Sequence, residues 1–325
     1  GHLNVHQDSA SRHDAGNSCA EDSPLELLLR GGTDVDFMTP VKIELRLRNL
    51  SPRPLRIDAR LQCSDGNVTV SIRGRDDKIV EYVPMTHRLR GALLKDLAPA
   101  ATAEPFLDRY SEELDLTYGR GGFYFDKPGE YVLQATYVGH DRRTVRSNTL
   151  RLLIARPDSA DETRAQDFFS HDVGKCLYLQ GSHSPHLRKG LDVLREAVDR
   201  REGTAAGARL AESIAKGIAD PFFFRIEKDG NGESERRDKP PDPEAALKFS
   251  EPAVAVFQSS TDRTVNLAHG RLARARCDWK RALRRVEEGH RELEIQLSVL
   301  EARGVHKSVL DELRSYLNSF FESQS

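Results

Sequence analysis

The stretch GGFYFDKPGEYVLQATYVG, residues 121–139, decides the fold of the first half of this 325-residue chain. Its segment DKPG (126–129) is turn sequence, because proline presets φ at about −65° and glycine adopts positive φ without steric cost. From Tyr131 to Val138, one set of side chains alternates with another. Since a strand points successive side chains to opposite faces, the stretch predicts a turn followed by a strand with one buried face.

Tyr131 stands directly after this turn, at the start of the predicted strand. In Greek-key sandwiches a tyrosine in this position bonds the backbone across the corner between two sheets. We therefore expect Tyr131, Pro128 and Gly129 to be structural residues, and we expect no catalytic role for Tyr131.

Alternation of the same kind recurs on both sides of this stretch. VKIELRLRNL (41–50) places Val41, Ile43, Leu45 and Leu47 on one face and charged residues on the other. Short strands at this spacing, each with one wet face, favour antiparallel pairing in a sandwich over residues 24–156, after a polar tail at 1–23. We expect five side chains in its interior: Leu45, Leu47, Ile57, Leu133 and Ala135.

The segment 84–111 interrupts this rhythm and is expected to form one helical turn and a loop. Long ordered loops on a rigid scaffold often carry binding residues. His87, Arg88 and Arg90 are therefore the candidate binding residues.

The chain resembles the immunoglobulin-like sandwich modules of bacterial multidomain proteins, many of them exported. Three segments carry the resemblance: VKIELRLRNLSPRPLRI (41–57), DLTYGRGGFYFDKPGEYVLQATY (115–137) and VRSNTLRLLIA (145–155). The resemblance implies a module that positions, stiffens or recruits, and it favours an extracytoplasmic location, periplasmic or secreted. Arginine outnumbers lysine 37 to 12, which is typical of a GC-rich bacterial genome.

After Pro157 the apolar period becomes helical, which predicts an α-helical domain over 157–325. A bundle or a short helical-hairpin repeat, with a weak resemblance to tetratricopeptide repeats, is expected. One long helix is predicted over 266–304, with Trp279 as a structural residue and Gly304 as the stop. The segment 227–246 is polar and rich in glycine and proline, and predicts a mobile loop.

No motif in the chain completes a catalytic or metal site. His2, His6 and His13 are weak candidate metal ligands, but Leu3 stands where a zincin motif needs glutamate. The four cysteines, at 19, 63, 176 and 277, form no CxxC pair. A disulfide between Cys19 and Cys63 is left as an alternative. We expect no cofactor and no catalytic residue.

Composition limits the partners further. The net charge of −2, from 49 basic and 51 acidic residues, gives no field that would attract nucleic acid, and no apolar run is long enough for a membrane span. The first residues lack the basic end and apolar core of a signal peptide.

The sequence therefore favours a non-enzymatic interaction or scaffolding protein of a bacterium. It would bind an unknown protein partner through the junction of sandwich and helices or through the 84–111 loop; the oligomeric state is open. Two alternatives remain. The chain could be the accessory C-terminal region of a larger exported hydrolase or peptidase, since it begins abruptly at GHLNVHQ, or it could be a carbohydrate-binding module.

Overall fold

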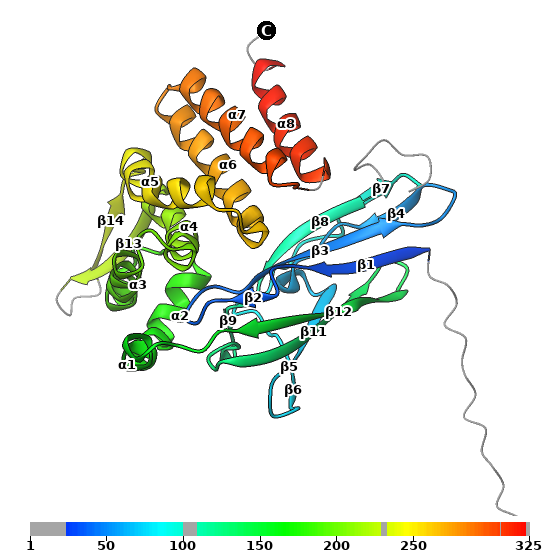
Figure 1. Ribbon diagram of the computed structural model, residues 1–325, viewed down its shortest axis with the longest axis horizontal. Helices are drawn as coiled ribbons and strands as arrows, with labels where there is room; N and C mark the ends of the chain where they lie inside the picture. The colour runs from blue at the N-terminus through cyan, green and yellow to red at the C-terminus, as the bar shows by residue number, and fades with distance from the viewer. Residues whose placement is uncertain (1–23, 100–108, 229–232, 306, 323–325) are drawn as a thin grey trace, which may run out of the picture.

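The structure, a computed structural model, describes residues 24–99, 109–228, 233–305 and 307–322. A β-rich part comes first and a helical part follows it, as the sequence predicted. In Figure 1 the strands (blue to green) form a curled sheet, and the helices (green to red) stand against one side of it.

Eight strands form the main sheet, in the order β6-β5-β11-β12-β1-β3-β8, with β2 paired to β12. Their bounds are β1 (Leu25–Arg30), β2 (Asp34–Val35), β3 (Lys42–Asn49), β5 (Val68–Arg73), β6 (Ile79–Glu81), β8 (Arg109–Asp115), β11 (Gly129–Val138) and β12 (Thr144–Ile154). Two further pairs are β4 (Leu55–Asp58) with β7 (Leu94–Leu97), and β9 (Tyr118–Gly119) with β10 (Gly122–Phe123).

The pairing is not antiparallel throughout, which corrects the prediction for the first strand. β1 pairs antiparallel with β3 along six residues, but on its other edge Leu27 pairs in parallel with Ser147 of β12. The β2 strand also lies parallel to β12. Alternation along a strand reports only which face is buried and not the direction of its neighbour, so the sequence could not reveal this.

The core of the β-rich part follows the alternation. The five side chains predicted inside are each at most 1% exposed: Leu45, Leu47, Ile57, Leu133 and Ala135. Tyr137 is fully buried, and its hydroxyl donates to the carbonyl of Asp58, 2.9 Å away. This bond ties the β4–β7 pair to the main sheet.

Tyr131 lies at the start of β11 with its ring largely buried, and its hydroxyl donates to the carbonyl of Lys127 at 2.9 Å. Gly129, inside this turn, has φ of 131°, a conformation that a side chain would strain. The bond from the Tyr131 hydroxyl thus stabilises the turn, and the turn fixes the position of the tyrosine ring.

Tyr131→Phe keeps the ring and removes this bond, so it should lower the free energy of unfolding by about 0.5–1.5 kcal/mol. Tyr178→Phe is the matched control, because the Tyr178 hydroxyl bonds Thr86 at an exposed site. Denaturant unfolding of both variants measures the difference. Equal stability of Tyr131→Phe and the parent would show that the bond contributes nothing.

The helical part holds eight helices within the described residues, each packed on the next along most of the chain. They are α1 (Ser159–Phe168), α2 (His171–Tyr178), α3 (Arg188–Arg200), α4 (Ala205–Ala219), α5 (Pro243–Ser259), α6 (Asn266–Ala282), α7 (Val286–Ala302) and α8 (Lys307–Glu322).

Two predicted loops need correction. The segment 84–111 contributes β7 and the first residues of β8, and its described residues form no helical turn. Instead of a loop at 227–246, β13 (Phe222–Lys228) pairs with β14 (Glu233–Lys239), and α5 begins at Pro243. Cross-strand pairing stabilises β14 despite its polar composition, a contribution that composition alone does not show.

The predicted helix over 266–304 is in fact two helices, α6 and α7. Arg284, between them, adopts φ of 61°. This left-handed conformation is uncommon for residues other than glycine, so an arginine gave no sequence signal for the break. The predicted stop at Gly304 is confirmed, because Gly304 has φ of 76° and follows the end of α7.

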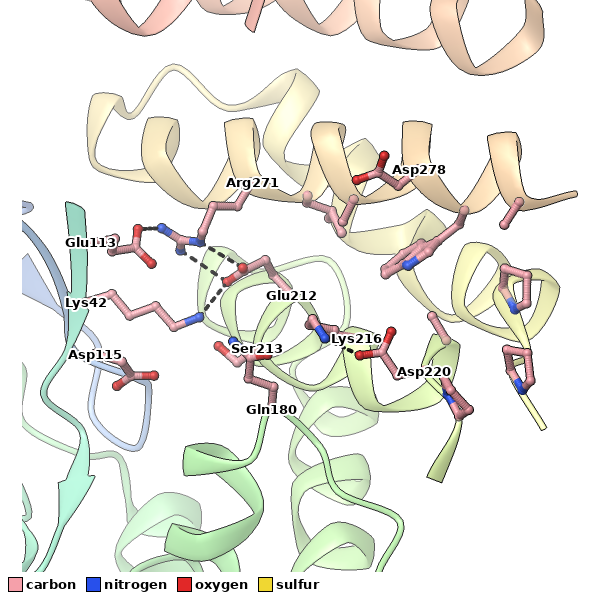
Figure 2. A pocket seen from close by; sticks show the side chains of 18 of the residues that line it. Lys42, Glu113, Asp115, Gln180, Glu212, Ser213, Lys216, Asp220, Arg271 and Asp278 are labelled. Atoms are coloured by element: carbon pink, nitrogen blue, oxygen red, sulfur yellow. Dashed lines mark hydrogen bonds and ion pairs between the residues drawn. The ribbon is translucent and has the colours of Figure 1, made fainter. Parts of the chain in front are cut away.

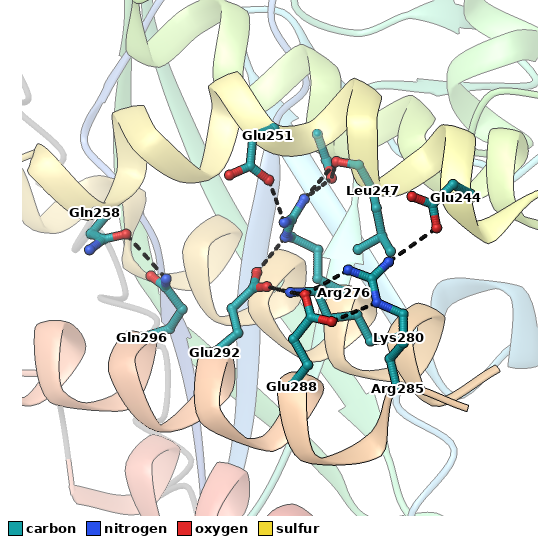
Figure 3. Close-up of polar contacts among 11 residues, drawn as sticks. Glu244, Leu247, Glu251, Gln258, Arg276, Lys280, Arg285, Glu288, Glu292 and Gln296 are labelled. Atoms are coloured by element: carbon teal, nitrogen blue, oxygen red, sulfur yellow. Dashed lines mark hydrogen bonds and ion pairs between the residues drawn. The ribbon is translucent and has the colours of Figure 1, made fainter. Parts of the chain in front are cut away.

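Buried charges join α5, α6 and α7. Arg276 on α6 is 3% exposed, and its guanidinium donates to the Leu247 carbonyl and the Glu251 carboxylate of α5 and to Glu292 of α7. Figure 3 shows Arg276 between the two neighbouring helices, with Lys280 beside it on Glu292. Burial raises the pKa of Glu292, but the bonds from Arg276 and Lys280 outweigh burial and hold the pKa below its usual value.

The helices meet the β-rich part at Gly174 of α2. A Cβ at this position would overlap the ring of Tyr118, which is buried and whose hydroxyl lies 2.8 Å from Nδ1 of His171. Glycine therefore permits α2 to lie directly on β9.

Candidate functional site

A cleft of about 770 Å³ lies where the edge of the sheet meets α4 and α6. This junction cleft is lined from the β-rich part by Lys42 and by residues of β8, and from the helical part by Glu212 and Arg271 among others (Figure 2). Its volume falls within the range of about 300–1,000 Å³ that is typical of ligand sites.

The inner wall of the junction cleft is a network of four charged side chains. Glu212 of α4 accepts from Lys42 of β3 at 3.1 Å and from Arg271 of α6 at 2.9 and 3.2 Å. Arg271 also forms an ion pair with Glu113 of β8. Figure 2 shows Glu212 between the two cations. One carboxylate thus joins the sheet to two helices.

The centre of this network is removed from water, while its outer members, Glu113 and Arg271, keep 26% and 29% of their side chains exposed. The side chain of Glu212 is 9% exposed, and burial raises its pKa, although the charge and hydrogen bond of Lys42 oppose the shift. Burial lowers the pKa of Arg271 to about 9, which leaves the guanidinium charged at neutral pH. The network is therefore costly to bury and strongly dependent on its partners.

The opposite wall of the junction cleft is apolar. Leu272, Ala275, Trp279 and Ala282 line it from α6, and three prolines face them: Pro221, Pro241 and Pro243. Ala282 is exposed at the last position of α6. This wall offers contact area to an apolar side chain of a bound molecule.

Several charged groups at the rim are not used in ion pairs. Within the described residues, Glu112, Asp115 and Asp278 line the junction cleft and form no ion pair with a lysine or arginine. Glu112 accepts from the Tyr110 hydroxyl at 2.7 Å, and Asp115 accepts from the backbone of Thr117 at 3.0 Å. Their charges are available to a cationic partner.

A second hollow, of about 410 Å³, continues the junction cleft along the same boundary between sheet and helices. The two share Gln62, Arg88, Asp115 and Gln180 as lining residues. Beyond these, the second hollow reaches Tyr178 at the end of α2. Together they form a groove that suits an extended molecule better than a compact one.

The candidate residues from the sequence are divided between this groove and other places. Arg88 and Arg90 line the junction cleft, where Arg90 forms an ion pair with the buried Asp65. His87 is exposed and does not line it. Trp279 is buried and forms part of its apolar wall. His2, His6, His13 and Cys19 lie outside the described residues.

The sequence did not single out Lys42, Glu113, Glu212 or Arg271. Alternation assigned Lys42 and Glu44 to a wet face, yet the helices cover part of that face, and Glu44 is only 9% exposed. Partners that lie 170 residues apart, such as Lys42 and Glu212, leave no local signal. On α4, Glu212 shares its helix face with Arg209 and Lys216, so the sequence shows an ordinary charged face there and gives no hint of a buried carboxylate.

The described residues contain no group of three or more histidine, cysteine, aspartate or glutamate side chains that could hold a metal. In that same part of the chain, no helix has the length and apolar character needed to cross a membrane. The three described cysteines, Cys63, Cys176 and Cys277, are buried, and burial raises the pKa of each thiol to about 11 or 12. Such thiols are poor nucleophiles at neutral pH.

Comparison with known proteins finds no matching family model and no matching curated protein. Among solved structures, the CARDB domain of the PF1109 protein from Pyrococcus furiosus is 13% identical, and the alignment covers 40% of this chain and 87% of that one, with a TM-score of 0.22. A β-glucosidase from Listeria innocua is 11% identical, over 40% of this chain and 16% of that one, with a TM-score of 0.23.

Spo0M, a sporulation control protein from Bacillus subtilis, is 8% identical over 48% of this chain and 54% of that one, with a TM-score of 0.24. Similarities at this level carry no argument about function.

Proposed function

We propose that this chain is a non-enzymatic interaction or scaffolding protein that binds a segment of a protein partner in the junction cleft. The observation that carries the proposal is that both parts of the chain build the cleft and that the Glu212 network locks them together around it. A preorganised cleft loses little entropy when a partner binds.

The composition of the walls supports a peptide rather than a small substrate. The apolar wall around Trp279 and the charged rim at Glu112, Asp115 and Asp278 lie in one groove. A protein segment can use both at once, because its side chains alternate in character. The charged groups of the inner wall are paired with one another. Such pairing suits a rigid binding surface better than acid–base catalysis.

The proposed function also includes a specific architecture for the two walls of the cleft. An immunoglobulin-like sandwich as the rigid support, and stacked helical hairpins as the second wall, would suit a module that recruits other proteins. A bacterial origin and an extracytoplasmic location remain part of the same proposal.

The test is a selection of random peptides displayed on phage against the intact chain, followed by calorimetric titration of the enriched peptides. Ala282→Trp fills the outer end of the cleft and should weaken binding of the enriched peptides at least about tenfold, which corresponds to about 1.4 kcal/mol. Ala302→Trp is the matched control, since Ala302 is also exposed and is the last residue of its helix, α7.

Thermal unfolding of both variants checks that they fold equally well. Peptides that bind the two tryptophan variants equally tightly, or a selection without enrichment, would contradict the proposed function.

A further inference from the structure

The sheet ends at the junction cleft with an open strand edge. The strand order stops at β8, which pairs only with β3 in the described part of the chain. Glu112, Glu113 and Asp115 of β8 line the cleft. An unpaired edge of this kind is a template for a further strand.

The ladder shows which main-chain groups face outward. Lys42 lies opposite Asp115, and the N–H of Leu116 donates to the carbonyl of Val41 at 2.9 Å. Bonded and non-bonded pairs alternate in an antiparallel ladder, so the even-numbered residues of β8 bond to β3. The N–H and C=O groups of Ser111, Glu113 and Asp115 therefore point to the open edge.

Gln62 gives independent support for this direction. Its side-chain amide donates to the carbonyl of Glu113 at 2.8 Å. A bond from outside the ladder reaches this oxygen only if the oxygen faces away from β3. The same amide lies 3.3 Å from a carboxylate oxygen of Glu112.

Charge decides what can pair with this edge. Glu112 and Asp115 have no ion-pair partner in the described residues, and Asp278 faces the cleft from α6. Arg88 is the one lining cation in that part of the chain without a carboxylate partner. A second copy of β8 would bring the same carboxylates against one another, and like charges opposite each other destabilise a strand pair.

We infer that the partner segment binds as an added strand on β8 and carries lysine or arginine side chains toward the carboxylates of the cleft. This inference rests on the proposed function and specifies its ligand as a basic, extended peptide. Main-chain bonds to the Glu113 N–H and to Asp115 supply affinity, while the Glu113 carbonyl keeps its bond from Gln62, and the carboxylates select the sequence.

The probe is a capped synthetic peptide of alternating lysine and valine, titrated calorimetrically into the intact chain, with a glutamate–valine peptide as control. The lysine peptide should bind and the glutamate peptide should not. Two N-methylated peptides are then compared, one methylated at its odd-numbered residues and one at its even-numbered residues; these are the two phases. Methylation should weaken binding at least about tenfold in one phase and leave it unchanged in the other, because only every second residue bonds to β8.

On the protein side, Glu113→Pro is compared with Glu113→Ala. Both variants lose the ion pair with Arg271, but only proline loses the outward N–H, and proline is tolerated on an edge strand when that N–H faces away from the ladder. The proline variant should bind the lysine peptide at least about threefold more weakly than the alanine variant.

Two results would overturn the added strand: N-methylation with equal effect in both phases, or equal affinity of the Glu113→Pro and Glu113→Ala variants. If phage-selected peptides still bind and respond to Ala282→Trp in that case, the proposed function stands and only the strand pairing fails. If neither those peptides nor the lysine peptide bind, both fail.

Discussion

Glu212→Ala is expected to lower the free energy of unfolding by about 3–5 kcal/mol, the cost of removing one partner from a buried ion network. Lys42 and Arg271 would then face each other across the junction without the carboxylate that joins them. Arg271 would keep only Glu113, and Lys42 would be left half-buried without an acidic partner. Denaturant unfolding of the intact chain measures this loss.

Glu196→Ala is the control for this prediction. Glu196 is also a helical glutamate bound to an arginine, Arg164, but its side chain is 65% exposed. An exposed pair contributes about 0–1 kcal/mol. Similar losses in the two variants would mean that the network does not hold the sheet and the helices together, and the cleft would then lack its rigid inner wall.

Arg276→Ala should be as costly, again about 3–5 kcal/mol. Its guanidinium reaches the Leu247 carbonyl, Glu251 and Glu292, so the change removes the bonds that connect α5, α6 and α7. Glu292 would remain with Lys280 alone. Arg276→Met removes the charge but retains most of the apolar side-chain stem. Comparing it with Arg276→Ala separates the contribution of the charge to stability from that of packing.

Arg314→Ala serves as the comparison, because Arg314 also pairs with two carboxylates, Glu301 and Asp311, at an exposed site on α8. We expect it to change the free energy of unfolding by less than about 1 kcal/mol. If Arg276→Met were as stable as the parent, the buried charges would be replaceable by packing, and the network would not account for the cohesion of the three helices.

The sequence was most informative where structure is local. Alternation placed Leu45 and Leu133 in the core correctly, since the period of two alone determines which face is buried. Gly304 ended a helix as expected, because a left-handed stop depends on that residue. The break at Arg284 was missed for the same reason: no glycine marks it.

The candidate site was harder to predict from the sequence than the fold. Arg88 and Arg90 were selected from the 84–111 segment and do line the junction cleft, but the residues of its inner wall come from β3, β8, α4 and α6. Lys42 gave the signal of an ordinary exposed strand residue. Only the packing of helices on that face converts Lys42 and Glu212 into a buried pair, and such contacts leave no periodic trace.

Hydrogen exchange of the intact chain, with and without a saturating phage-selected peptide, tests most directly whether the junction cleft binds a protein segment. We expect slower exchange on both sides of the cleft, in β8 (Arg109–Asp115) and at the C-terminal end of α6, and no change in the β13–β14 pair. Protection confined to other elements, or protection of only one side of the cleft, would contradict the account.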